Sequence, residues 1–269
     1  MVGQDMVTSG MKQYLRDLAK RKDLIIYLVI SGLKAQHKNS FLGYFWWLID
    51  PFLNVAIYYF VVVVIFQRPG GAAYGMYLVS GMIVWRWMAA TVSSASNSIL
   101  SQGGIISQVY LPKSVFPVGA ALNHLVNFGF GLIIIFIFLF YFNYSLGSQI
   151  IWLPVIILVQ LVFMLAISFP IAFVCVFIRD VNNLVDHGMR LWFFGSPVIW
   201  YKDMIPEHLV ILLKVNPMYH LLDAYRSVFM ENTGPDGMAL LIIAAGSVLA
   251  IVPMLYFYSL KEHLILKSL

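Results

Sequence analysis

Two charged residues lie inside long apolar runs, where an ionised side chain is costly. Asp50 occurs in the segment WWLIDP, and Arg86 stands between two tryptophans. A charge at the centre of a bilayer costs on the order of 2.5–3.5 kcal/mol, so such side chains usually face a cavity or a partner. Pairing Asp50 with Arg86 would offset both costs, but the two residues are predicted at different depths, which disfavours a pair. Extension of Arg86 towards a lipid headgroup is the simpler alternative.

Aromatic residues, which make up 16% of the chain, are the second unusual feature. An interfacial aromatic belt explains the rings at the ends of apolar runs, but it does not easily explain Tyr58 and Tyr59, which lie within one. Aromatic faces stack on the apolar C–H faces of sugars, and Trp and Tyr add a polar group. This pattern suggests a path for a polysaccharide. The candidate lining residues are Trp46, Trp47, Tyr58, Tyr59, Phe60, Phe193, Phe194 and Trp200.

The sequence contains no recognisable catalytic or metal-binding pattern. Because it has no G-x-x-x-x-G-K-[ST] loop, the chain cannot itself be a P-loop ATPase. Its six histidines are scattered without the spacing of metal ligands, and no Ser/His/Asp or paired-carboxylate cluster can be identified. The single cysteine, Cys175, excludes an intrachain disulfide. We therefore expect neither an enzyme nor a metal site.

The elements that position these residues follow from composition. Of the 269 residues, 61% are hydrophobic and only 11% are charged, whereas soluble domains are about 45–50% apolar and about 25% charged. Together with a mean hydropathy of +0.85, this predicts an all-α polytopic membrane protein with one membrane domain over residues 1–269. A soluble enzyme, a disordered chain and a disulfide-rich secreted domain are excluded. In such a protein, a net charge of +5 indicates cytoplasmic loops rather than a nucleic-acid partner.

Six segments are candidates for transmembrane helices, because a bilayer core about 30 Å thick needs roughly 20 apolar helical residues. Five of them are continuous: residues 45–66, 76–96, 119–142, 151–178 and 238–260. The sixth, residues 181–201, begins polar and is interrupted by Gly195 and Pro197. Six spans place both termini on one side of the membrane.

Basic residues indicate which side that is. Twelve Lys and Arg residues fall on the side of the termini, against only four on the other side. Because cytoplasmic loops carry the excess of basic residues, both termini are predicted to be cytoplasmic. The four on the opposite side are Arg68, Lys202, Lys214 and Arg226.

The region from residue 11 to residue 38 is predicted to lie at the cytoplasmic interface. Met11, Tyr14, Leu15 and Leu18 recur at the i, i+3, i+4 and i+7 positions of an amphipathic helix. The apolar run 23–33 is too short to span a bilayer and ends in basic residues, which is typical of an interfacial helix. Anchoring to anionic lipid and docking of a cytoplasmic partner both remain consistent with it.

Residues 202–237 do not resemble a simple hydrophilic loop. Pro206 can begin one short helix, and Asn216 followed by Pro217 has the pattern of an N-cap and a first helical residue. Neither helix is long enough to cross. The segment is either a re-entrant hairpin in the outer leaflet or a pair of interfacial helices.

Five segments, in this order and topology, resemble the permease subunits of ABC exporters that move polysaccharides such as O-antigen, capsule and teichoic acid. The similarity covers nearly the whole chain. The segments are HKNSFLGYFWWLIDPFLNVAIYYFVVVVIF (37–66), YLVSGMIVWRWM (77–88), ISQVYLPKSVFPV (106–118), FIRDVNNLVDHGMRLWFFGSPVIW (177–200) and NPMYHLLDAYRSVF (216–229).

The resemblance implies a homodimer of six-span subunits in the bacterial inner membrane, bound to two copies of a separate ATP-binding cassette subunit. ATP and Mg²⁺ would belong to that subunit, so no cofactor is expected in this chain. The interface helix and the loop 98–113 would meet the ATPase through residues such as Lys22, Asp23 and Lys113. The hairpin 202–237 would close the outer side of the pore.

The substrate implied by the resemblance is a glycan on a polyprenyl pyrophosphate, entering laterally between the first and fifth spans. Cations bind phosphate through charge-assisted hydrogen bonds. By predicted topology, Lys34, Lys38 and Arg190 are the nearest cations, although contact with ordinary membrane lipid explains them equally well. A permease for teichoic acid, capsule or a small hydrophobic drug shares the fold. An ion-coupled secondary transporter is disfavoured because no inverted repeat or midplane carboxylate array is visible.

Overall fold

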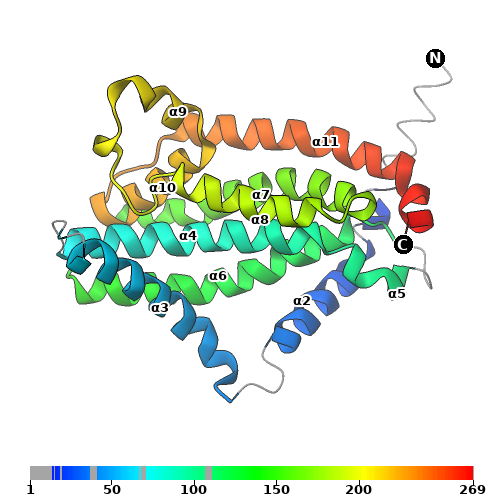
Figure 1. Cartoon of the computed structure of the whole chain (residues 1–269), viewed down its shortest axis with the longest axis horizontal. Coiled ribbons are helices and arrows are strands. Elements are labelled where there is room, and N and C mark those ends of the chain that lie inside the picture. Colours follow the sequence, from blue (N-terminus) through cyan, green and yellow to red (C-terminus); the bar gives the residue numbers. More distant parts are fainter. Residues whose placement is uncertain are drawn as a thin grey trace.

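The computed structural model describes residues 14, 16–18, 20–36, 41–65, 67, 71–106 and 111–268. Within these residues the protein is helical and contains no strand, which confirms the all-α prediction. The longest helices lie side by side along the long axis of the molecule (Figure 1). They are α4 (Ala72–Ser96), α6 (Val115–Tyr141), α7 (Leu153–Phe177) and α11 (Gly237–Ser268).

Among the described residues, four helical segments are long and apolar enough to cross a membrane: Trp46–Ile65, Val115–Tyr141, Ser148–Phe177 and Gly237–Leu266. At a rise of about 1.5 Å per residue, each reaches the roughly 30 Å of a bilayer core. The predicted spans 76–96 and 181–201 correspond to α4 and α8 (Val181–Phe194). Neither is in this group of four. With its 14 residues, α8 is only about 21 Å long.

The interruptions predicted from Gly195 and Pro197 occur where expected. Helix α8 ends at Phe194, and the chain turns through residues 195–198. By contrast, α3 (Trp46–Tyr59) continues without a break into a π-helical turn, Phe60–Ile65, although Pro51 lies inside it. This turn completes the 20-residue apolar segment.

Helix α4 is the centre of the bundle. It packs most extensively against α6 and also contacts α7, α8 and α3. At the contact with α6, the rings of Trp87 and Phe128 stack with centroids 4.3 Å apart. Gly131 permits the close approach of the two helices, since a Cβ at this position would lie 2.6 Å from the side chain of Ile83. The core therefore lies around the helix that carries Arg86.

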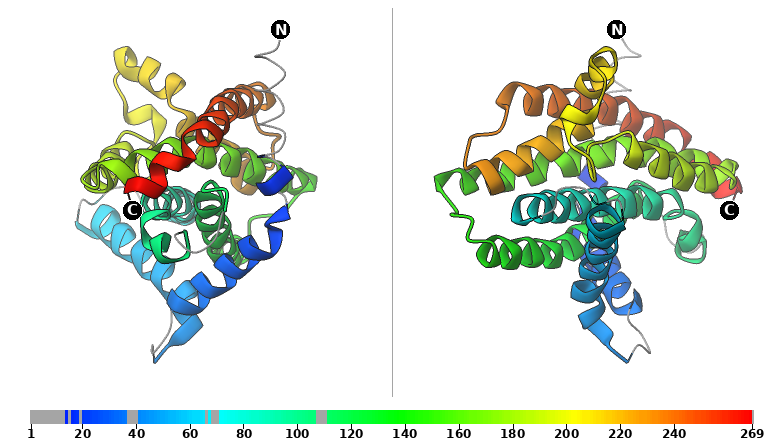
Figure 2. Two further views of the ribbon diagram at one scale, coloured as in Figure 1. Left: turned by 90° about the vertical axis from the view of Figure 1, so that its right-hand side faces the viewer. Right: turned by 60° about the vertical axis from the view of Figure 1, so that its left-hand side comes forward.

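The N-terminal helix α2 (Lys22–Gln36) packs along α6 and buries none of its own residues. It diverges from the bundle, and α3 diverges on the same side (Figures 1 and 2). The helix predicted near residues 23–33 is therefore present, as α2, and its position at a membrane interface stays a prediction. The pattern predicted from residue 11 rests partly on residues outside the described ones.

Two short helices occupy the segment predicted as a hairpin. They are α9 (Val210–Val215) and α10 (Pro217–Arg226), followed by a π-helical turn, Ser227–Glu231. The predicted cap is confirmed, because the side chain of Asn216 accepts a hydrogen bond from the backbone N–H of Met218 at 3.0 Å. Both short helices lie at the end of the bundle opposite the C-terminus of α11 (Figure 1).

Candidate functional site

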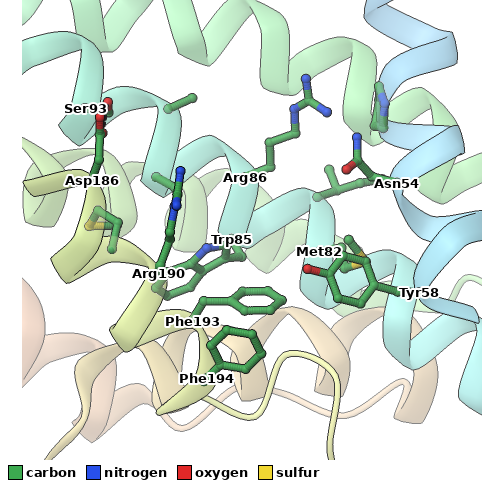
Figure 3. Close-up of a pocket in the computed structure, with 15 residues that line it drawn as sticks. Asn54, Tyr58, Met82, Trp85, Arg86, Ser93, Asp186, Arg190, Phe193 and Phe194 are labelled. Carbon is green, nitrogen blue, oxygen red and sulfur yellow. Dashed lines mark hydrogen bonds between the residues drawn. The ribbon is translucent and has the colours of Figure 1, made fainter. Parts of the chain in front are cut away.

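A cavity of about 670 Å³ lies between α3, α4 and α8 (Figure 3). We call it the α3–α8 cavity. Its residues come from helices far apart in the sequence, because α3 and α8 both pack against α4. It has an aromatic part and a polar part. Its labelled lining residues in Figure 3 are Asn54, Tyr58, Met82, Trp85, Arg86, Ser93, Asp186, Arg190, Phe193 and Phe194.

The aromatic part is organised around Phe193, which is mostly buried. Its ring centroid lies 5.8 Å from that of Tyr58 on α3 and 5.7 Å from that of Trp85 on α4. The ring centroid of Phe194 lies 5.1 Å from that of Phe193. Aromatic contacts of this kind prefer tilted and edge-on geometries, as found here. One phenylalanine at the end of α8 thus joins three helices around the cavity.

The polar part comes from α4 and α8. Asp186 and Arg190 are four residues apart and therefore lie on one face of α8. Asp186 accepts a hydrogen bond of 2.5 Å from the hydroxyl of Ser93 on α4, while Arg190 is exposed. A cavity with ring faces on one part and a guanidinium on another suits a ligand that carries both apolar C–H surfaces and negative charge.

A second cavity, of about 330 Å³, is lined by residues of α2, α3, α4 and α6. We call it the α3–α6 cavity. It contains an ion pair between Arg86 and Asp50. The prediction that these two residues would not pair is therefore wrong. Arg86 and Pro51 line both cavities, so they form part of a wall between them.

The predicted aromatic path is divided in the single chain. Tyr58, Phe193 and Phe194 line the α3–α8 cavity, whereas Trp46 and Trp47 line the α3–α6 cavity. The other three lie elsewhere. The ring centroids of Tyr59 and Tyr74 lie 6.3 Å apart in a tilted arrangement, and the side chain of Phe60 is 55% exposed. The indole N–H of Trp200 donates a hydrogen bond to the carbonyl oxygen of Phe194 at 3.1 Å. The role of these rings in transport stays a prediction.

Of the three predicted phosphate-binding cations, Lys38 lies outside the described residues, and the other two are not found together. Arg190 lines the α3–α8 cavity, and Lys34 lies exposed on α2, which packs against α6. Of the two described cations, only Arg190 is thus placed beside a cavity of suitable chemistry.

Of the three predicted docking residues, Lys22 and Asp23 are exposed at the start of α2. Lys113 is fully buried. Its ammonium group donates to the carbonyl oxygen of Leu111 at 2.8 Å, and its backbone N–H donates to a carboxylate oxygen of Glu262 at 2.5 Å. Burial lowers the pKa of Lys113, and the negative charge of Glu262 opposes this shift. In this conformation the Lys113 side chain is not offered to a partner.

Sequence reasoning also missed a buried cation. Arg226 at the end of α10 is only 7% exposed. Its guanidinium donates to the carbonyl oxygens of Pro197 at 2.8 Å, Val198 at 3.2 Å and Tyr77 at 3.3 Å, and it covers the ring of Tyr77 at 3.3 Å. The available signal was spacing, since Arg226 lies four residues after the buried Leu222 and so on the same face of the helix.

Possible metal ligands are dispersed in the part of the chain that the structure describes. No group of three or more His, Cys, Asp or Glu residues there could hold a metal ion. The expectation that the chain needs no cofactor remains a prediction.

Comparison with known proteins gives a consistent assignment over most of the chain. Residues 23–230 match the sequence profile described as ABC-2 type transporter. The chain is 28% identical over 240 residues to the O-antigen export system permease protein RfbA of Myxococcus xanthus, covering 88% of this chain and 92% of that protein. Two proteins of the same name from Klebsiella pneumoniae are each 28% identical over 244 residues, covering 89% of this chain and 92% of theirs.

Proposed function

The chain belongs to the ABC-2 type transporter family, and we propose on this premise that it is the transmembrane subunit of an ATP-driven exporter of O-antigen. The family implies an ATP-binding cassette partner, and the apolar helices make the chain a multi-pass protein of the inner membrane. The relatives that cover about nine-tenths of the chain are named as export permeases for this glycan. ATP and Mg²⁺ would be bound by the partner.

The observation that carries the proposal from the structure is the composition of the α3–α8 cavity. Tyr58, Trp85 and Phe193 offer ring faces to sugar C–H surfaces, and Arg190 offers a guanidinium to phosphate. This combination matches a glycan linked to a polyprenyl pyrophosphate. A small hydrophobic drug would leave the charged part of the cavity without a partner, which disfavours that alternative.

The proposed topology has six spans with both termini in the cytoplasm. In this arrangement α4 and α8 are the two spans that bring the four long apolar segments to six. Their polar residues are tolerated because α4 is surrounded by other helices and α8 borders the cavity, where charged groups need not face lipid. The helices α9 and α10 would form a re-entrant hairpin on the outer side.

The proposed assembly is a homodimer with two ATPase subunits. The α3–α8 cavity is open in the single chain, and a second copy placed against it would complete a pathway that the glycan enters between α3 and α8. The exposed start of α2, with Lys22 and Asp23, is the proposed contact with the ATPase.

The proposal is tested by deleting the gene in the strain that produces the protein. Surface O-antigen, measured by immunoblot of lipopolysaccharide, should disappear and return with a plasmid copy, while lipid-linked glycan accumulates inside the deletion strain. Surface O-antigen that persists after deletion would contradict the proposed function.

The cavity is tested by variants expressed in that deletion strain. Tyr58→Ala and Arg190→Gln should each reduce surface O-antigen about tenfold, because each removes a contact worth about 1.4 kcal/mol. Tyr141→Ala, which removes a ring that is 74% exposed, is the matched control and should export normally. Co-purification of the ATPase checks that every variant assembles. If Tyr58→Ala and Arg190→Gln export like the control, the α3–α8 cavity is not the glycan path.

A further inference from the structure

The α3–α6 cavity contains a carboxylate, Asp50, that does not line the proposed glycan path, and this carboxylate pairs with Arg86, which lines both cavities. Its ion pair is accessible from the cavity, since the side chain of Asp50 is 44% exposed and that of Arg86 is 45% exposed. An ion pair that serves only to join two helices in an apolar bundle has no need of such access. This cavity is therefore the strongest remaining candidate for a binding site.

Both members of the pair have unused hydrogen-bonding capacity. Among the described residues, each of these two charged groups has the other as its only hydrogen-bond partner. A carboxylate can accept about four hydrogen bonds, and a guanidinium has five N–H donors. The pair can thus bind a further positive group at Asp50 and a further negative group at Arg86 without being broken.

Two neutral polar atoms on the cavity wall also have no hydrogen-bond partner within the described part of the chain. They are the Nε1 donor of Trp87 and the Oδ1 acceptor of Asn127. The amide group of Asn127 is held in place, because its Nδ2 donates to the side-chain oxygen of Gln36 at 3.2 Å. The cavity wall therefore supplies one hydrogen-bond donor and one hydrogen-bond acceptor in addition to the negative and positive charges of the ion pair.

The depth of the cavity follows from the length of α3. The apolar segment Trp46–Ile65 has 20 residues, which is about 30 Å of helix and just enough to cross the hydrocarbon core. Its first turn must then lie at the boundary of that core. The exposed Phe45 and Trp46 fit this position, because aromatic residues are enriched at membrane interfaces. The α3–α6 cavity, which includes this first turn, lies at the level of lipid headgroups.

We propose that the α3–α6 cavity binds the headgroup of a zwitterionic phospholipid with a primary ammonium group, of the phosphoethanolamine type. The phosphate lies against Arg86, and the ammonium group donates to Asp50. The charges of the cavity favour this class, since a purely anionic headgroup would meet the carboxylate of Asp50. A choline headgroup has no N–H to donate to it. The proposal requires that α3 spans the membrane, but it does not depend on which substrate is exported.

The first test uses the purified complex of the wild-type chain with its ATPase in detergent. Short-chain phospholipids are titrated and binding is followed by tryptophan fluorescence, since Trp46, Trp47 and Trp87 line the cavity. Dissociation constants are compared for phosphatidylethanolamine, its mono-, di- and trimethylated forms and phosphatidylglycerol. We expect phosphatidylethanolamine to bind about tenfold more tightly than the trimethylated form and phosphatidylglycerol. Equal affinities, or tighter binding of phosphatidylglycerol, would overturn the proposal.

The second test assigns this preference to the ion pair. Asp50→Asn and Arg86→Gln should each abolish the tenfold preference, and Asp50→Glu and Arg86→Lys should restore part of it. Arg190→Gln is the control, because it removes a guanidinium from the other cavity and should keep the full preference. Retention of the preference in Asp50→Asn and Arg86→Gln would refute the assignment. Should these variants fail to assemble, the methylation series on the wild-type complex decides the matter alone.

Discussion

Replacing Arg226 by methionine tests what holds α10 against the helix bundle. Arg226 connects α10 to the turn after α8, through the carbonyl oxygens of Pro197 and Val198, and to α4 through Tyr77. Methionine keeps most of the side-chain volume. The substitution therefore removes the donors and the positive charge while leaving little empty space.

The expected loss follows from the contacts of the guanidinium. A hydrogen bond from a charged group contributes about 1.5–3 kcal/mol; the bond of 2.8 Å to Pro197 belongs in this range, and the two longer bonds are weaker. A desolvated cation–π contact, as with Tyr77, contributes about 2 kcal/mol. The substitution also removes the desolvation cost of the buried charge, which offsets part of this loss of stability. We expect a net destabilisation of about 3 kcal/mol.

The assay is thermal unfolding of the purified complex in detergent. At about 2–4 °C per kcal/mol for a chain of this size, the melting temperature of Arg226→Met should fall by about 6–12 °C. Arg190→Met is the matched control, because Arg190 is exposed, and its melting temperature should change by less than about 2 °C. If both variants melt within about 2 °C of the wild type, Arg226 does not hold α10 against the helix bundle.

Further stability predictions use the same assay. Gly131→Ala should lower the stability by about 1–2 kcal/mol, because the new Cβ would lie 2.6 Å from a neighbouring side chain. Gly129→Ala, whose Cβ would have nothing within 4 Å, should be neutral or raise the stability by up to about 1 kcal/mol. If Gly129→Ala were the more destabilising of the two, the observed packing of α6 on α4 would be contradicted. Asn216→Ala should lower the stability by about 1–2 kcal/mol through loss of the N-cap of α10. Asn216→Asp, which can still cap the helix, should keep most of that stability. Equal losses of stability in the two variants would mean that the cap is unimportant. Tyr258→Phe should lower stability by about 1–2 kcal/mol, because its buried hydroxyl donates to a backbone carbonyl at 2.9 Å, while Tyr256→Phe at a less buried position should have no effect.

Much of the helix pattern could be predicted from the sequence, because it depends on local properties. The apolar run 45–66 corresponds to the observed segment Trp46–Ile65, and the run 119–142 lies almost wholly within α6, Val115–Tyr141. Side-chain transfer free energy and helix rise determine such lengths. The cap at Asn216 was predictable for a similar reason, since its hydrogen bond to Met218 involves neighbouring residues.

The contacts between helices could not be predicted in this way. The pairing of Asp50 with Arg86 was disfavoured because depth was counted from the ends of each span. In the structure α4 continues ten residues beyond Arg86 to Ser96, about 15 Å of helix, and the first turn of α3 lies beside its middle. Only tertiary packing sets this offset. Arg226 was counted only as one of the four basic residues on the side opposite the termini, and its burial was not predicted, since the burial of its face depends on how α10 docks against α4.

The wall that Pro51 and Arg86 contribute to both cavities has a mechanical consequence. Because both residues belong to both linings, a displacement of α3 at Pro51 would change the shape of both cavities. Proline supplies no backbone N–H and interrupts the hydrogen-bond ladder of a helix, so α3 has a point of lower bending stiffness where the two linings meet. A ligand that bends α3 at this point in one cavity would therefore also alter the other cavity.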